Sequence, residues 1–248
     1  MLTAPLYHGY TALDLVIVVL AVVVMPAMSA LAGRKLAREA PDAGKLTPRY
    51  VRIILRGALF AVLVVAAWWT EKRPFAALGL APHLSIWDYA GFVLAFLMGL
   101  VMLAQSATLA SAPAEKVERA MKAVRSAKIT PNTNQELALF MLMSVSAGIW
   151  EELVYRGFLI WFLVPLTGIA GAVAISAAIF GLGHIYQGVR GLVQTACVGL
   201  VFGTLYILTA SLWWLMVLHA VVDMAGGITT FQVKRAAARR AAAGNHVA

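Results

Sequence analysis

Three groups of ionisable or aromatic residues in the second half of the chain lie inside apolar segments. They are Glu151-Glu152-x-x-x-Arg156, Phe180-x-x-x-His184 and His219-x-x-x-Asp223. A charged side chain near the centre of a membrane span costs about 2.5–3.5 kcal/mol on insertion scales. Ionisable residues at such positions therefore indicate a functional site by default, and a structural charge network is the alternative.

Helical spacing indicates how these residues pair. Glu152 and Arg156 are four residues apart with the acid first, which is the better orientation for an ion pair on one helix face. Glu151 is rotated by about 100° from Glu152 and has no cation within a turn, so its partners must come from other helices. The other two pairs also share a face: Phe180 with His184, and His219 with Asp223.

Carboxylates and imidazoles around one cavity are suited to activating water. A glutamate in a water-poor site can serve as a general base near neutral pH, and imidazoles can move protons or stabilise an oxyanion. The same groups, Glu151, His184, His219 and Asp223, could instead bind a divalent metal such as zinc with a position left open for water. The single cysteine, Cys197, lies in an apolar span, where a buried and inert thiol is expected.

The composition indicates an integral membrane protein. The chain is 62% hydrophobic and only 12% charged, with a mean hydropathy of +0.84, whereas soluble domains carry about 25% charged residues. Its net charge of +9 comes from basic blocks between apolar segments, which is typical of loops near anionic lipid, so no nucleic-acid partner is expected. We predict one transmembrane domain over 1–233, with a catalytic core at about 134–232. The basic tail, 234–248, is expected to be disordered and cytoplasmic.

Seven apolar segments predict an all-α, polytopic transmembrane helix bundle of about seven spans. The expected spans are 10–31, 53–69, 85–110, 137–166, 170–186, 192–208 and 211–231. Residues 113–129 alternate charged and apolar positions, which predicts an amphipathic helix on the inner membrane surface, with a substrate-gating element as the alternative. The basic connection 34–56 is expected to be a cytoplasmic loop.

The distribution of basic residues predicts the orientation. An outside N-terminus and a cytoplasmic C-terminus place most of the 20 Lys and Arg residues on the inside, as expected for a bacterial inner membrane. At 1.5 Å per residue, Glu151 and His184 then lie roughly 21 Å below the outer surface. His219 and Asp223 lie about 10–18 Å below it by the same count. All four side chains can therefore meet in one polar cavity in the inner half of the membrane.

The three patterns, in this order on late spans, resemble the signature motifs of the CPBP family. This family comprises the CAAX prenyl endopeptidases and the bacteriocin-processing enzymes and is also called Abi. The resemblance covers about 150–223, and the earlier segments match only in general character. It implies an intramembrane endopeptidase with a site open toward the cytosol, in which Glu151 and His184 activate water and His219 and Asp223 steady the oxyanion. By the same resemblance Glu152, Arg156 and Phe180 order the site.

The residue at the end of the third motif leaves the chemistry open. The family has Asn or Asp there, and this chain has Asp223. An ionised aspartate cannot donate a hydrogen bond to an oxyanion, so it must be protonated, orient His219 or ligate a metal. Glutamate-type and metal-dependent hydrolysis are therefore both compatible with the motifs.

The resemblance implies a membrane-associated peptide or protein as substrate, prenylated if the CAAX part of the family name applies. Bacteriocin maturation, peptide-export processing and self-immunity are equally compatible. A proton-coupled transporter with Glu151, His184 and His219 as a relay is one alternative, although the sequence has no inverted repeat. A non-catalytic scaffold or immunity protein is another, and the complete set of four site residues weighs against it.

Overall fold

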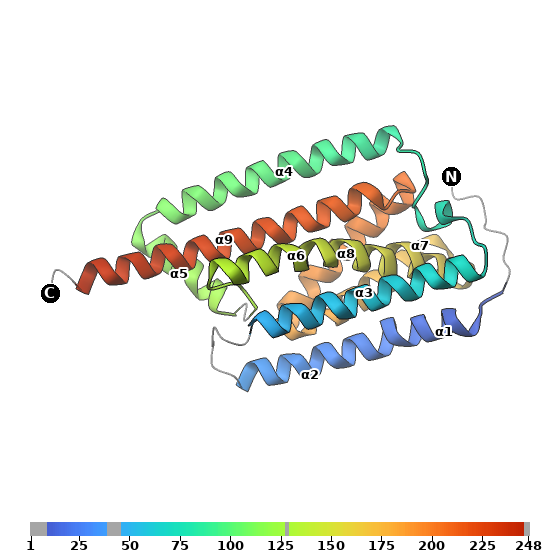
Figure 1. The fold of residues 1–248 in the computed structure, drawn as a ribbon, viewed down its shortest axis with the longest axis horizontal. Coiled ribbons are helices and arrows are strands. Elements are labelled where there is room, and N and C mark those ends of the chain that lie inside the picture. The colour runs from blue at the N-terminus through green and yellow to red at the C-terminus, as the bar shows by residue number, and fades with distance from the viewer. Residues whose placement is uncertain (1–8, 39–45, 127–128, 246–248) are drawn as a thin grey trace.

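The protein is described by a computed structural model that covers residues 9–38, 46–126 and 129–245, and in these ranges every regular element is a helix. The first half of the chain contains α1 (Ala12–Val19), η1 (Leu20–Val24), α2 (Met25–Arg38), α3 (Leu46–Thr70), η3 (Phe75–Leu78), α4 (Ile86–Ser111) and α5 (Ala114–Ser126). They are followed by α6 (Asn134–Glu151), η4 (Glu152–Leu159), α7 (Ile160–Gly183), η5 (Ile185–Gln187), α8 (Gly188–Thr209) and α9 (Trp213–Asn245). Figure 1 shows an elongated bundle with α4 along one side, α1 and α2 along the other, and α6 and α9 between them.

Within the described ranges, six helical stretches are long and apolar enough to cross a membrane, and one of them has the length for two crossings. That stretch, Asn134–Gly183, has 50 residues and would be about 75 Å long if straight, more than twice a bilayer core of about 30 Å. It reverses at Gly168, whose φ of 70° and ψ of 173° are not helical. Beyond this turn Ser176 Oγ donates to the Tyr155 carbonyl at 2.7 Å, so α7 returns along the preceding span. The predicted all-α transmembrane bundle is confirmed.

Two of the helices begin with side-chain caps that also join the helix to its neighbours. Thr11 and Asp14 form a capping box at the start of α1, and Ser85 and Asp88 form one at the start of α4. Asp14 accepts two hydrogen bonds of 2.7 Å from Arg73, and Asp88 accepts one from Ser211, which precedes α9. These links fix the helix ends at the end of the bundle opposite the last residues of α2 (Figure 1).

The second span begins seven residues earlier than predicted. Residues 46–52 form the first turns of α3, whereas the sequence predicted a loop through 56 because of its basic residues and prolines. Pro48 lies in the first helical turn, where no backbone N–H is required, and is therefore compatible with a helix. The residues 39–45 of the predicted loop lie outside the described ranges.

The end of α9 also differs from the prediction. Residues 234–245, which we expected to be disordered, continue the helix to Asn245. The alanine-rich composition of this segment favours a helix, and Lys234 Nζ donates to the Thr130 carbonyl at 2.9 Å and to Asn132 Oδ1 at 2.8 Å.

The predicted amphipathic helix is present as α5. Its Val117 is buried against Val233 of α9, so the apolar face of α5 packs on protein. Its location on the inner membrane surface stays a prediction. Cys197 on α8 is exposed, so the expectation of a buried thiol is wrong. An apolar segment permits either position, because lipid-facing and core-facing residues have similar polarity in a membrane protein.

Candidate active site

The two adjacent glutamates lie where α6 passes into a π-helical segment. Glu151 is the last residue of α6, and η4 runs from Glu152 to Leu159 with π-helical hydrogen bonding. Every residue from 151 to 160 is buried, so this stretch is surrounded by other helices on all sides. π-helical turns occur frequently at functional sites. The sequence predicted an ordinary helix here and did not indicate the change of hydrogen bonding.

A buried ion pair lies beneath the site. Glu152 Oε1 accepts from Arg156 Nη1 at 2.8 Å, with the two side chains 0% and 2% exposed, which confirms the predicted pairing. The same oxygen lies 2.7 Å from His219 Nδ1 on α9. Because a carboxylate only accepts, Nδ1 of His219 carries a proton and its Nε2 faces the cavity. Among the described residues, Glu152 Oε2 has no hydrogen-bond partner.

Phe180 links this ion pair to the second histidine. The Arg156 guanidinium lies 4.3 Å from the centre of the Phe180 ring and 5.3 Å from that of Phe202, which places the cation against aromatic faces. The same Phe180 ring packs edge to face on His184, with ring centres 4.8 Å apart. The Phe180 carbonyl accepts from His184 Nδ1 at 2.9 Å, so His184 also directs its Nε2 into the cavity.

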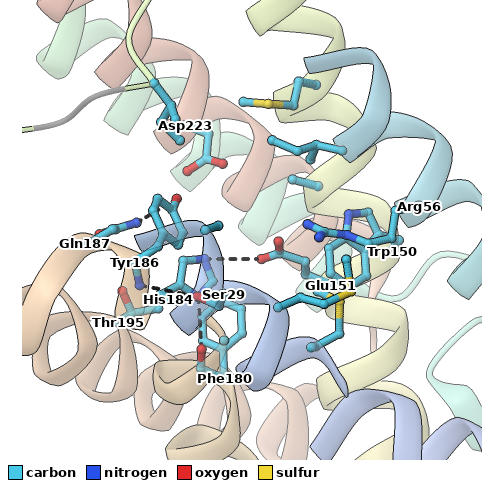
Figure 2. A pocket seen from close by; sticks show the side chains of 18 of the residues that line it. Ser29, Arg56, Trp150, Glu151, Phe180, His184, Tyr186, Gln187, Thr195 and Asp223 are labelled. Atoms are coloured by element: carbon cyan, nitrogen blue, oxygen red, sulfur yellow. Dashed lines mark hydrogen bonds and ion pairs between the residues drawn. The ribbon is translucent and has the colours of Figure 1, made fainter. Parts of the chain in front are cut away.

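The structure brings the four predicted catalytic residues to one cavity, and Figure 2 shows Glu151, His184 and Asp223 in it. Glu151 Oε2 lies 4.0 Å from His184 Nε2 and 3.7 Å from His219 Nε2, and His219 Nε2 lies 3.7 Å from Asp223 Oδ2. These separations are too long for direct hydrogen bonds but suit one water molecule between each pair. The Glu151 side chain is 11% exposed and that of Asp223 is 40% exposed, so Glu151 lies deep and Asp223 lies nearer solvent.

Glycines allow the helices that carry these residues to approach closely. A Cβ at Gly148 of α6 would lie 2.6 Å from the Met216 carbonyl oxygen of α9. A Cβ at Gly181 of α7 would lie 2.8 Å from the Leu192 carbonyl oxygen of α8. Each glycine lies within three residues of a catalytic candidate, and backbone contact at these points sets the distances across the site.

The site faces a cavity of about 940 Å³. Its lining combines apolar residues, many of them from η1, α2 and α3, with polar side chains from α2, α3 and the later helices. Sequence analysis did not identify several of these polar residues: Ser29, Arg49, Arg52, Arg56, Tyr155, Tyr186 and Thr195. The three arginines had a usable signal, because spacings of three and four residues place them on one helix face.

The possible metal ligands lie farther apart than a zinc ion would hold them. Ligands that share a tetrahedral zinc at 2.0–2.1 Å lie about 3.4 Å from each other. The nitrogen–oxygen separations at the site are 3.7–4.0 Å. Within the described ranges, no group of three or more His, Cys, Asp or Glu residues could hold a metal ion. The arrangement therefore does not fit a metal centre, and we derive no step through one.

Comparisons with known proteins are consistent with the motifs. Residues 133–225 match a family model described as "Type II CAAX prenyl endopeptidase Rce1-like". No curated protein and no solved structure gave a significant match to the chain. The matched segment begins at the N-cap of α6 and ends within α9, so it contains Glu151, His184, His219 and Asp223.

Proposed function

We propose that the chain hydrolyses peptide bonds within the membrane by means of a water molecule activated by a glutamate. The premise is that residues 133–225 form an Rce1-like domain, which is consistent with the CPBP family. The domain supports an intramembrane endopeptidase in general. The single observation that carries the finer proposal is the position of Glu151. Its carboxylate faces Nε2 of two histidines from two other helices, at distances that suit a shared water.

In the proposed mechanism a water molecule lies between Glu151 and His184 Nε2. Glu151 takes a proton from this water, and the water oxygen attacks the carbonyl carbon of the scissile bond. The same glutamate then delivers its proton to the departing nitrogen, and the peptide bond breaks. His184 is held by the Phe180 carbonyl with its lone pair toward the water, which orients the nucleophile.

His219 is proposed to stabilise the oxyanion. A neutral His219 presents only a lone pair from Nε2, so the donor in this step is its protonated form. Three carboxylates surround the ring, those of Glu151, Glu152 and Asp223, and they compensate for the positive charge. Asp223 then acts as a counter-charge, and no hydrogen bond from an aspartate to the oxyanion is needed.

The proposed substrate is a peptide segment associated with the membrane, and the proposed access is from the cytosol. Residues at the end of α2 and the start of α3 line the cavity, and these helix ends carry the basic residues that the positive-inside rule assigns to the cytoplasmic face. The apolar lining from η1 and α2 suits a lipid chain on the substrate. We therefore propose a prenylated substrate, an outside N-terminus and a bacterial inner membrane.

The test is peptide cleavage by the purified chain in lipid nanodiscs, with farnesylated and unmodified forms of each peptide. We expect Glu151→Gln and His184→Ala to lose about 10²-fold or more of kcat, the usual contribution of a general base. Glu115→Gln is the matched control, because Glu115 is 75% exposed on α5. Full activity of Glu151→Gln would refute the role of this residue, and activity lost to a chelator and restored by zinc would refute metal-independent chemistry.

A further inference from the structure

The wall of the cavity carries a tyrosine hydroxyl that the proposed mechanism does not use. Tyr155 belongs to η4, four residues and so about one helical turn after Glu151, and it lines the cavity. A Cβ added to Gly183 would lie 3.3 Å from the Tyr155 hydroxyl oxygen, so this oxygen lies beside the residue that precedes His184. The hydroxyl is therefore close in the chain to one of the residues proposed to hold the water and close in space to the backbone that carries the other.

The Tyr155 ring is fixed by its neighbours, whereas its hydroxyl has no protein partner. The residue is only 2% exposed. Its ring packs edge to face on Phe180, with ring centres 5.0 Å apart, and its carbonyl accepts from Ser176 Oγ. Among the described residues, no group forms a hydrogen bond with the hydroxyl. A buried tyrosine hydroxyl usually has a partner, so a group that enters the cavity is expected to supply it.

We propose that the Tyr155 hydroxyl donates a hydrogen bond to the oxyanion that forms at the scissile carbonyl, which makes Tyr155 a further catalytic residue. This inference rests on the proposed endopeptidase function. When water attacks the carbonyl carbon, a proton passes to Glu151 and the π electron pair of the carbonyl moves to its oxygen. The tyrosine keeps its own proton throughout. The electron pair returns to carbon as the carbon–nitrogen bond breaks and the nitrogen takes the proton from Glu151.

The other groups at the site leave this role open for a neutral donor. With Nδ1 of each ring bonded to the protein, a neutral His184 or His219 presents only a lone pair from Nε2. An ionised Asp223 has no proton to donate. A tyrosine hydroxyl keeps its proton at neutral pH, so Tyr155 donates whether or not His219 is protonated. Because no other acceptor competes for its proton among the described residues, the hydroxyl can serve the oxyanion without first breaking a bond.

The test uses a farnesylated peptide and an analogue of it in lipid nanodiscs. In the analogue a phosphonamidate replaces the scissile amide, so that tetrahedral anionic oxygens occupy the place of the oxyanion. Tyr155→Phe removes only the hydroxyl. Tyr206→Phe is the matched control, because Tyr206 is 1% exposed and lies outside the cavity lining. Cleavage is measured as kcat and KM, and binding of both ligands is measured by fluorescence anisotropy in a Glu151→Gln background, where the peptide is not consumed.

We expect Tyr155→Phe to lower kcat by about 10²-fold, the usual effect of removing one oxyanion donor, with KM nearly unchanged. It should weaken binding of the phosphonamidate by about tenfold or more and leave binding of the peptide unchanged. Its melting temperature should not fall, because the hydroxyl has no protein partner to lose. Tyr206→Phe should change neither kcat nor the affinity for either ligand. An unchanged kcat in Tyr155→Phe, or an equal loss of affinity for both ligands, would overturn the inference.

Cleavage and binding together separate this inference from the function on which it rests. If the wild type and Tyr155→Phe cleave the peptide equally fast, the role of the tyrosine is wrong and the peptidase stands. If the peptide is not cleaved but binding of the phosphonamidate depends on the Tyr155 hydroxyl, the peptidase is wrong and the hydroxyl remains a donor to a tetrahedral anion. If the peptide is not cleaved and this binding is independent of the hydroxyl, both are wrong.

Discussion

The buried pair of Glu152 and Arg156 provides a test of how the site is supported. Both neighbours of Glu152, Arg156 Nη1 and His219 Nδ1, contact the same carboxylate oxygen, Oε1. Glu152→Ala removes both contacts and leaves a buried guanidinium without an anion, which typically costs about 3–5 kcal/mol. For a chain of this size the melting temperature should fall by roughly 6–20 °C, at about 2–4 °C per kcal/mol.

Glu152→Gln should be considerably milder. Its amide oxygen can occupy the place of Oε1 and accept from both neighbours, and its amide nitrogen then occupies the place of Oε2, which has no partner among the described residues. The guanidinium loses its anion but keeps a hydrogen-bond acceptor, which alanine does not provide, and charge-assisted hydrogen bonds are roughly twice as strong as neutral ones. We expect a cost of about 1–3 kcal/mol. Thermal unfolding in detergent, followed by circular dichroism, measures both variants.

The pair of Asp14 and Arg73 is the matched control, because there both carboxylate oxygens are used. Arg73 donates to Oδ1 and Oδ2 at 2.7 Å each, and Thr11 also donates to Oδ2. An asparagine must direct its NH₂ at one of these donors, so Asp14→Asn should destabilise nearly as much as Asp14→Ala. The reasoning fails if glutamine at 152 is as harmful as alanine, or if asparagine at 14 is well tolerated.

Two further predictions concern helix packing and the role of Asp223. Gly148→Ala should destabilise the fold by about 1–3 kcal/mol, because its Cβ would meet backbone atoms of α9. Gly226→Ala should be neutral or stabilising, because a Cβ there would have no atom within 4 Å. Equal melting temperatures of the two variants would contradict this. Asp223→Asn should lower kcat by less than about tenfold, because the carboxylate is 40% exposed and lies 3.7 Å from His219. A thousandfold loss of peptide cleavage would show instead that Asp223 takes part directly in the reaction.

The pairing of polar residues could be predicted from sequence because it depends on local geometry. The four-residue spacing of Glu152 and Arg156 is sufficient to place both on one face, and the structure has this ion pair. The meeting of Glu151 with His184 and His219 followed from counting residues along each span. Such a count gives comparable depths because each residue is counted from the end of its span at the outer surface.

The arginines of α3 show where sequence reasoning failed. Lys and Arg near a span end serve as topology signals, so the basic residues of 34–56 led to the prediction of a cytoplasmic loop over the whole segment. In the structure Arg49, Arg52 and Arg56 belong to a helix and line the cavity. The positive-inside rule depends on the number of charges near a span end and contains no information about the direction in which the side chains point. Only packing against α6 distinguishes an arginine in the cavity from one at the lipid surface.

The segment η4 shows why charges are tolerated at the centre of this bundle. Membrane helices usually expose one face to lipid, yet every residue from 151 to 160 is buried by neighbouring helices. Within this stretch Glu152 and Arg156 neutralise each other and contact no lipid, which avoids most of the insertion cost of a charge. Glu151 precedes the π-helical turn and lies at the wall of the cavity. The same element therefore holds one carboxylate fixed in an ion pair and leaves the adjacent one available to water, which is the separation of roles that the proposed hydrolysis requires.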